Sequence, residues 1–263
     1  MTRPTTPFFP RLGGKTKLAS KIVKEFPKNY EDLKYVEVFT GGGSVFWKMK
    51  PSKIQSVLND KNRDIYDLWR DMKSHGEKVA DMDFSKCDRK YYESLKKQNN
   101  LSGAKRLFRN LSISKLSFGG MRTTFVAEKE CQRRIGKNIG SRLKKRAVDY
   151  KEALKGVKIH NMDFRRVLKK YDSKNTFFYL DPPYSPKMEK SKWFYTDDKK
   201  STLTPEDVLN SVKNLKGKFL ISYNYSPKIK KLFSAYKVKT IKTTYTIQPT
   251  GSAGVRELLI KNY

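Results

Sequence analysis

The sequence predicts an α/β fold: a doubly wound, mostly parallel seven-stranded sheet with an antiparallel C-terminal hairpin, plus a smaller, mainly helical inserted domain. Short apolar runs alternate with helical patterns near both ends of the chain, as in parallel α/β sheets. Each of the first five runs ends in a polar or glycine-rich turn. The alternation stops between about residues 64 and 154, where the sequence is helical and basic. These three observations define the fold class.

Seven segments have the character of strands, and helical patterns separate several of them. The last two read as the arms of a terminal hairpin, joined by a loop with Gly251 and Gly254. The strands are expected at residues 35–39, 56–58, 157–160, 176–180, 218–222, 238–245 and 257–263. The helices are expected at residues 15–25, 63–73 and 205–215.

The interruption predicts two domains. Residues 1–63 and 155–263 form the sheet domain, and residues 64–154 form the insert. From residue 101 to residue 147 the insert has thirteen Lys and Arg residues, opposed only by Glu128 and Glu130. Such a surface suits phosphate contacts. The alternative is a solvated basic face or a habit of composition, because lysine is frequent throughout the chain.

Composition narrows the function further. The 263 residues include 58 Lys and Arg against 26 Asp and Glu, and the net charge of +32 favours a polyanionic partner. No apolar run approaches the ~18 residues of a membrane span, and the N-terminus has no secretory pattern. Two histidines and two cysteines give little material for a zinc site, so no metal is expected. The cysteines fit a reduced, intracellular setting.

A glycine-rich turn and an acidic residue suggest a nucleoside-bearing cofactor. Residues 40–44, Thr-Gly-Gly-Gly-Ser, follow the first strand, and glycines there allow close approach of a ligand to the backbone. Asp60 stands nineteen residues after Gly41, at the end of the next strand, where a carboxylate can accept hydrogen bonds from ribose. The alternatives are a plain turn and a helix N-cap.

The segment Gly13-Gly14-Lys15-Thr16 resembles part of a phosphate loop but does not have its spacing. That motif needs a glycine five positions before Gly14, where this chain has Phe9, and no strand precedes the segment. Hydrolysis of nucleoside triphosphates is therefore not expected.

The most specific motif is Asp181-Pro182-Pro183-Tyr184, directly after an apolar strand. Two prolines fix the backbone, so the Asp181 carboxylate and the Pro182 carbonyl can face one point as hydrogen-bond acceptors. An exocyclic amine on a nucleobase can donate to both, and the Tyr184 ring can stack on the base. The alternative is a rigid proline turn.

Together these residues resemble the Dam-type DNA adenine-N6 methyltransferases, of the alpha group of amino-methyltransferases. The order agrees over nearly the whole chain: Gly-Gly-Lys, the glycine turn, Asp60, the insert, Asp163-Phe164, then residues 181–184. The resemblance implies a Rossmann-like catalytic domain that binds S-adenosylmethionine, and an insert that recognises the DNA target.

The resemblance also implies roles for single residues. Lys15 and the turn would flank the methionine part of the cofactor, Glu37 its amino group, Asp60 its ribose, and Asp163 with Phe164 its adenine. Asp181, Pro182 and Tyr184 would serve the target base. The complete expected cofactor site consists of Arg11, Lys15, Glu37, Phe39, Gly41, Gly43, Ser44, Asp60, Asp163, Phe164 and Asp181.

The basic insert is expected to contact DNA around the break at Gly119-Gly120. Ser114, Ser117, Met121, Arg122 and Thr124 are candidates for reading bases, and an unimportant surface turn is the alternative. The full expected DNA-binding set is Arg109, Ser114, Lys115, Ser117, Met121, Arg122, Thr124, Arg133 and Arg134.

The expected reaction is site-specific methyl transfer to N6 of an adenine flipped out of duplex DNA. The alternatives are an RNA adenine, a cytosine N4 or a protein amide as substrate, or a non-catalytic basic DNA-binding protein on the same fold. We expect a monomer or weak dimer, located with DNA in the cytoplasm, the nucleoid or a host cell. A cognate restriction endonuclease, acting separately, is a further expected partner.

Overall fold

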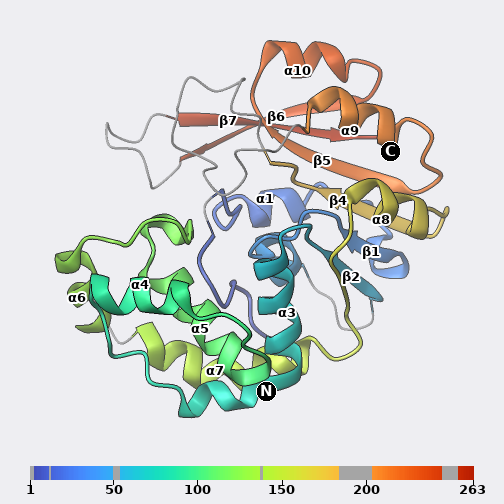
Figure 1. Cartoon of the computed structure of the whole chain (residues 1–263). Coiled ribbons are helices and arrows are strands. Elements are labelled where there is room, and N and C mark those ends of the chain that lie inside the picture. Colours follow the sequence, from blue (N-terminus) through green and yellow to red (C-terminus); the bar gives the residue numbers. More distant parts are fainter. Residues whose placement is uncertain (1–2, 12, 50–53, 137–138, 184–202, 245–253) are drawn as a thin grey trace. The chain divides into compact units, whose positions relative to one another are not determined.

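The computed structural model describes residues 3–11, 13–49, 54–136, 139–183, 203–244 and 254–263 (Figure 1). The chain divides into two compact units. The helical unit comprises Met1–Gly14 and Asn62–Gly156, and the sheet unit comprises Lys15–Lys61 and Val157–Tyr263.

The N-terminal segment belongs to the helical unit, although the sequence analysis placed it in the sheet domain. Aromatic packing explains the difference. The ring of Phe8 lies 5.1 Å from that of Trp69 and 5.5 Å from that of Tyr150. The Tyr150 hydroxyl also donates to the Thr6 carbonyl at 2.9 Å. These contacts between distant parts of the sequence leave no local pattern that could have predicted them.

The sheet unit contains, in its described residues, a seven-stranded sheet in the order β3-β2-β1-β4-β5-β7-β6. β1 to β5 pair in parallel, and β7 is antiparallel to both β5 and β6. The strands are β1 (Lys34–Glu37), β2 (Ser56–Asn59), β3 (Lys158–His160), β4 (Thr176–Leu180), β5 (Lys218–Asn224), β6 (Lys237–Thr244) and β7 (Gly254–Lys261). The predicted fold class is confirmed, and β4 has the predicted bounds.

Two helices of the sheet unit, α8 and α9, begin at side-chain caps. Thr204 and Asp207 form a reciprocal capping box at the start of α9, and the Asp163 side chain caps α8. The elements are α1 (Ala19–Val23), η1 (Tyr30–Asp32), α2 (Ser44–Lys48), α8 (Phe164–Tyr171), α9 (Pro205–Val212) and α10 (Pro227–Leu232). Buried side chains of the strands pack with α8 and α9 in one apolar core, and every residue of β4 is buried.

In its described residues the helical unit contains five α-helices and two short 3-10 turns (Figure 1). Asn62 caps the first helix by accepting hydrogen bonds from the Asp64 and Ile65 amides. The elements are α3 (Arg63–His75), η2 (Gly76–Asp81), α4 (Arg89–Lys97), α5 (Gly103–Leu116), η3 (Phe118–Gly120), α6 (Glu128–Gly136) and α7 (Ile139–Ala153). No helix in the described part of the chain is long and apolar enough to cross a membrane.

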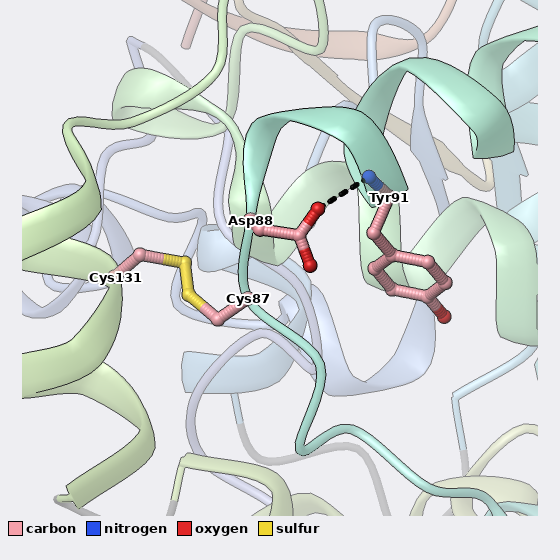
Figure 2. The surroundings of a disulfide bond; sticks show 4 residues. All are labelled: Cys87, Asp88, Tyr91 and Cys131. Carbon is pink, nitrogen blue, oxygen red and sulfur yellow. Dashed lines mark hydrogen bonds between the residues drawn. A yellow bond between two sulfur atoms is a disulfide. The ribbon is translucent and has the colours of Figure 1, made fainter.

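A disulfide joins Cys87, just before α4, to Cys131 in α6 (Figure 2). Their Cα atoms are 5.9 Å apart, and both side chains are buried in a cluster with Tyr92 and Phe125. Asp88 caps α4 by accepting a hydrogen bond from the Tyr91 amide at 2.6 Å, and Figure 2 marks this bond with a dashed line. The structure therefore differs from the reduced thiols expected from the sequence, because folding brings together two cysteines that lie 44 positions apart.

Candidate functional site

The predicted carboxylates of the sheet unit lie where three neighbouring strands end. β1 pairs with β2 on one side and with β4 on the other. Glu37 ends β1, Asp60 follows β2, and Asp181 follows β4. The fold thus brings these side chains to the carboxyl edge of the sheet, where doubly wound folds bind ligands.

The glycine turn is tied to the end of β2 by Asp60. Gly41 (φ +49°) and Gly43 (φ +67°) adopt left-handed backbone angles that glycine accommodates at low cost. The Gly41 amide donates to Asp60 Oδ2 at 2.8 Å. The helix-cap alternative for Asp60 does not hold, because Asn62 caps α3. Asp60 and the turn thus form one structural element, in which the acid orients the loop.

Lys15 joins two carboxylates that are far apart in the sequence. Its Nζ lies 3.2 Å from Asp181 Oδ1 and 2.8 Å from Glu257 Oε1. The side chains of Lys15 and Glu257 are 2% and 0% exposed, whereas that of Asp181 is 21% exposed. Asp181 is therefore the member of this group that solvent or a ligand can reach.

Asp181 also receives a hydrogen bond from Ser222 in β5. The Ser222 hydroxyl donates to Asp181 Oδ1 at 2.9 Å, and its oxygen lies 2.9 Å from the Tyr179 hydroxyl. Burial raises the pKa of Asp181, and Lys15 and Ser222 oppose this effect while Glu257 adds to it. These contacts fix one oxygen of the carboxylate.

Glu37 is buried, and burial raises its pKa to about 8. The Tyr35 hydroxyl donates to Glu37 Oε2 at 2.7 Å and opposes the shift, whereas the nearby Asp181 charge adds to it. Glu37 is therefore mostly neutral at neutral pH, and a cation beside it would favour its ionised form.

The remaining predicted cofactor residues surround this edge or shape it. The rings of Phe39 and Phe164 lie 5.4 Å apart, and Asp163 accepts from the Arg165 amide at 3.0 Å as the cap of α8. Ser44 starts α2, with its hydroxyl 3.1 Å from that of Thr16. Asp163 was expected to bind adenine, but its Oδ1 already accepts a hydrogen bond from the backbone as the cap of α8.

Two predictions lie outside this arrangement. Tyr184 is outside the described residues, whereas Pro182 before it is buried. Arg11 belongs to the helical unit, where its carbonyl accepts from the Gly14 amide at 3.2 Å. Both roles remain predictions.

Asp181 and Glu257, both with little solvent exposure, pair with the ammonium of Lys15, and the buried Glu37 carboxyl is close enough to Asp181 for their charges to interact. In a chain of net charge +32 this is a local excess of acidic groups, and a ligand that carries positive charge would favour their ionised forms, including that of Glu37. No group of three or more His, Cys, Asp or Glu residues among the described positions could hold a metal ion.

A model of the D12 class N6 adenine-specific DNA methyltransferases matches residues 12–247. The chain belongs to this family. It is also similar to the Type II methyltransferase M.MjaIII of Methanocaldococcus jannaschii, with 25% identity over 98% of the chain and 99% of that protein. The Type II methyltransferase M1.LlaDCHI of Lactococcus lactis subsp. cremoris is 25% identical over 98% of the chain and 95% of that protein. The resemblance seen in the motifs is confirmed.

In the helical unit of this adenine-specific methyltransferase, Arg122 is turned inward. Its guanidinium donates to the Asn110 carbonyl at 2.9 Å, to Asn110 Oδ1 at 2.9 Å, to Ser114 Oγ at 2.8 Å and to Asp64 Oδ2 at 3.1 Å. Arg122 is 8% exposed and has a left-handed φ of +67°. In this conformation it holds the unit together, which counts against the expected reading of a base.

Several other candidates for DNA contacts have internal partners too. Ser114 and Ser117 are fully buried, and Arg109 Nε donates to the Leu95 carbonyl at 2.9 Å. Lys115 lies 5.0 Å from the Phe84 ring, and burial lowers its pKa to about 8. Arg133 pairs with Glu130 at 2.6 Å.

Exposed surface remains around the loop of residues 118–124 of the methyltransferase. Met121 is half-buried, Thr124 is exposed, and Phe118 is 46% exposed. The Arg134 side chain lies outside the described residues. Phe118 is the strongest exposed candidate for a DNA contact, and its place directly before Gly119-Gly120 is the sequence signal for it.

Sequence reasoning missed the residues that hold Asp181. Glu257 of β7 pairs with Lys15, and Ser222 of β5 donates directly to Asp181. Asn59, also missed, donates to the Val38 and Met162 carbonyls and so fixes the end of β2. The one available signal was an acidic residue, Glu257, directly before the apolar run of residues 258–260.

Proposed function

We propose that the protein transfers a methyl group from S-adenosylmethionine to N6 of an adenine flipped out of duplex DNA, at a specific sequence. One observation carries the proposal. Asp181 follows a fully buried strand, is fixed through Oδ1, and has an Oδ2 to which no described residue donates a hydrogen bond. A carboxylate oxygen held in this way suits the amino group of a base.

The charge of the site supports S-adenosylmethionine as the donor. This cofactor has a sulfonium and an α-ammonium group, and the acids around Lys15 fit both. Glu37 is assigned to the ammonium group, Asp60 to the ribose, and Phe39 with Phe164 and Asp163 to the adenine. The turn at residues 41–44, Lys15 and Arg11 complete the proposed cofactor site.

When bound, the cofactor supplies an electrophilic methyl group that needs no metal and no covalent enzyme intermediate. Asp181 Oδ2 and the Pro182 carbonyl accept the two N–H bonds of the adenine amine and direct its lone pair toward the methyl carbon. Asp181 would stabilise the positive charge that develops on nitrogen as the amine takes up the methyl group. The proton leaves afterwards. Tyr184 stacks on the base.

The helical unit is proposed to bind the duplex and recognise the target. Flipping the base costs a few kcal/mol, about 1–3 kcal/mol of which stacking on an aromatic ring recovers. The lysines of the unit suit phosphate contacts, and Phe118, Met121 and Thr124 are placed on the loop that remains accessible.

The remaining parts of the proposal concern partners and location. The protein acts on duplex DNA inside the cell, as a monomer or weak dimer. The relatives named Type II methyltransferases favour a cognate restriction endonuclease that acts separately on the same site.

The proposal is tested by exposing duplex DNA and, separately, RNA to the purified protein with S-adenosylmethionine. Nucleoside mass spectrometry should find N6-methyladenine in the DNA, and modification-sensitive sequencing should place it in one short motif. Asp181→Ala should abolish transfer while cofactor and DNA binding largely persist. Methylation confined to RNA or to cytosine, or a near-normal rate in the variant, would contradict the proposal.

A further inference from the structure

We propose that Glu257 and Ser222 are positioning residues for methyl transfer, which hold Asp181 by one oxygen so that the other meets the amine of the target base. Glu257 acts through Lys15, and Ser222 acts directly. The inference rests on the proposed function, because it assigns a task to residues around the same carboxylate.

The contacts of Asp181 are one-sided. Ser222 Oγ, at 2.9 Å, and Lys15 Nζ, at 3.2 Å, both approach Oδ1, and no described residue donates to Oδ2. Two donors on one oxygen restrict rotation of the carboxylate about its last torsion. The free oxygen therefore keeps one direction before the base arrives, and such alignment lowers the barrier of transfer.

Glu257 divides the charge of Lys15 between two acids. Glu257 lies in β7, opposite Asn224 of β5 and Ile241 of β6, and its side chain has no solvent exposure. A carboxylate at such a position is costly unless it has a charged partner, and Lys15 at 2.8 Å is that partner. Because Glu257 takes part of the Lys15 charge, Lys15 neutralises Asp181 less than it would alone. Asp181 is therefore a stronger hydrogen-bond acceptor than it would be without Glu257.

Ser222 links Asp181 to the strand beneath it. Tyr179 and Asp181 are two positions apart, so their side chains leave the chain on the same face. A hydroxyl has one hydrogen, and Ser222 gives it to Asp181. The Tyr179 hydroxyl, 2.9 Å from Ser222 Oγ, is then the donor to Ser222. The order Tyr179, Ser222, Asp181 is a directed chain of hydrogen bonds that starts in the buried sheet.

The two residues act on the pKa of Asp181 in opposite directions. The Glu257 charge raises this pKa, and the Ser222 hydrogen bond lowers it. Because transfer needs the ionised carboxylate, the acid limb of kcat against pH includes this pKa together with that of Glu37, whose charge interacts with Asp181. Glu257→Gln should move the limb to lower pH, and Ser222→Ala should move it to higher pH.

The experiment measures kcat and KM for duplex methylation across pH, with cofactor affinity and melting temperature recorded for each variant. E257Q and S222A should each lose about tenfold in plateau kcat, with limb shifts of opposite sign. S222T, which keeps the hydroxyl, should restore the wild-type limb. Two matched controls should leave kcat and the limb unchanged. Glu25→Gln removes a carboxylate that pairs with Lys239 and Lys261, and Ser56→Ala removes a buried strand serine.

The outcomes separate this inference from the proposed function. If the wild-type protein transfers no methyl group, both are overturned. If the wild type is active but the E257Q and S222A limbs stay in place or move in the same direction, the inference alone is overturned. If E257Q does not fold, S222A and S222T test the inference instead. It holds if the acid limb of S222A moves to higher pH and that of S222T returns to the wild-type position, and it is overturned otherwise.

Discussion

Glu37 shows how one buried residue couples stability to pH. Its pKa rises from the ordinary 4.5 to about 8 because burial disfavours the charged form. Between these values the folded protein keeps the proton that the unfolded chain has lost. Unfolding then releases a proton, so rising pH favours unfolding. The stability due to neutral Glu37 is complete below about pH 4.5 and is lost as pH approaches 8.

We therefore predict that Glu37→Gln makes stability less dependent on pH. Glutamine can still accept the hydrogen bond from Tyr35 but cannot ionise. The melting temperature of E37Q minus that of the wild type should become more positive from about pH 5 to about pH 8. Thermal melts at several pH values give this difference. Parallel curves would show that Glu37 titrates normally.

At the scale of an element, the conformation of the loop of residues 118–124 depends on one of its own side chains, that of Arg122. Phe118 N donates to the Thr124 carbonyl at 2.8 Å, and Val126 N donates to the Leu116 carbonyl at 2.9 Å. Between these bonds, the Arg122 guanidinium fixes the loop to α5. Gly120 has a φ of +72°, and a Cβ there would clash with the Pro10 carbonyl. The loop is thus held from both sides.

We predict that Arg122→Ala costs about 2–3 kcal/mol of stability, because it removes a buried guanidinium that donates to Asn110, Ser114 and Asp64. Arg122→Gly should cost about 1 kcal/mol less, because glycine relieves the left-handed φ. Urea unfolding measures both values. Arg133→Ala, at an exposed ion pair, is the control and should change stability by less than about 1 kcal/mol. Unchanged stability in R122A, with relaxed target sequence, would restore Arg122 as a base reader.

Elements with a strong local signal were predictable, and contacts between distant strands were not. Residues 176–180 form an unbroken buried strand and were predicted with the observed bounds. The helix expected at 15–25 is only Ala19–Val23, because turns at the Lys15 carbonyl precede it. Glu257 and Ser222 gain their roles only when β7 inserts beside β5, and this pairing leaves no local pattern. Arg122 was misleading because its burial depends on closure of the whole loop.

At the scale of the whole molecule, the two units are stabilised differently. The disulfide between Cys87 and Cys131 lies in the helical unit and joins two residues that are 44 positions apart in the sequence. A loop of this length limits the unfolded chain and contributes up to about 4 kcal/mol. The sheet unit relies on its apolar core.

We predict that reduction destabilises the helical unit selectively. Scanning calorimetry with a reductant should lower the transition of that unit. The transition of the sheet unit, identified by its rise with S-adenosylmethionine, should stay in place. Alkylation of the denatured protein before and after reduction gives the state of the thiols. A common shift of both transitions would contradict this assignment.

The net charge of +32 predicts DNA affinity that is strongly sensitive to salt. In the helical unit, Arg106 and Arg122 pair with internal acids, whereas Lys105 and Lys145 are exposed to solvent. Lysines of this kind can displace counterions from phosphates, so binding should weaken on the order of a thousandfold between about 50 and 200 mM salt.

Fluorescence anisotropy of a labelled duplex at several salt concentrations measures this dependence. Lys105→Glu and Lys145→Glu should each reduce the slope of log affinity against log salt by about 1, and about equally on all sequences. Lys230→Glu makes the same change of charge on exposed α10 of the sheet unit and is the matched control. An equal loss in K230E would mean that total charge, rather than the helical unit, grips the backbone. A slope near zero would remove the electrostatic basis of DNA binding altogether.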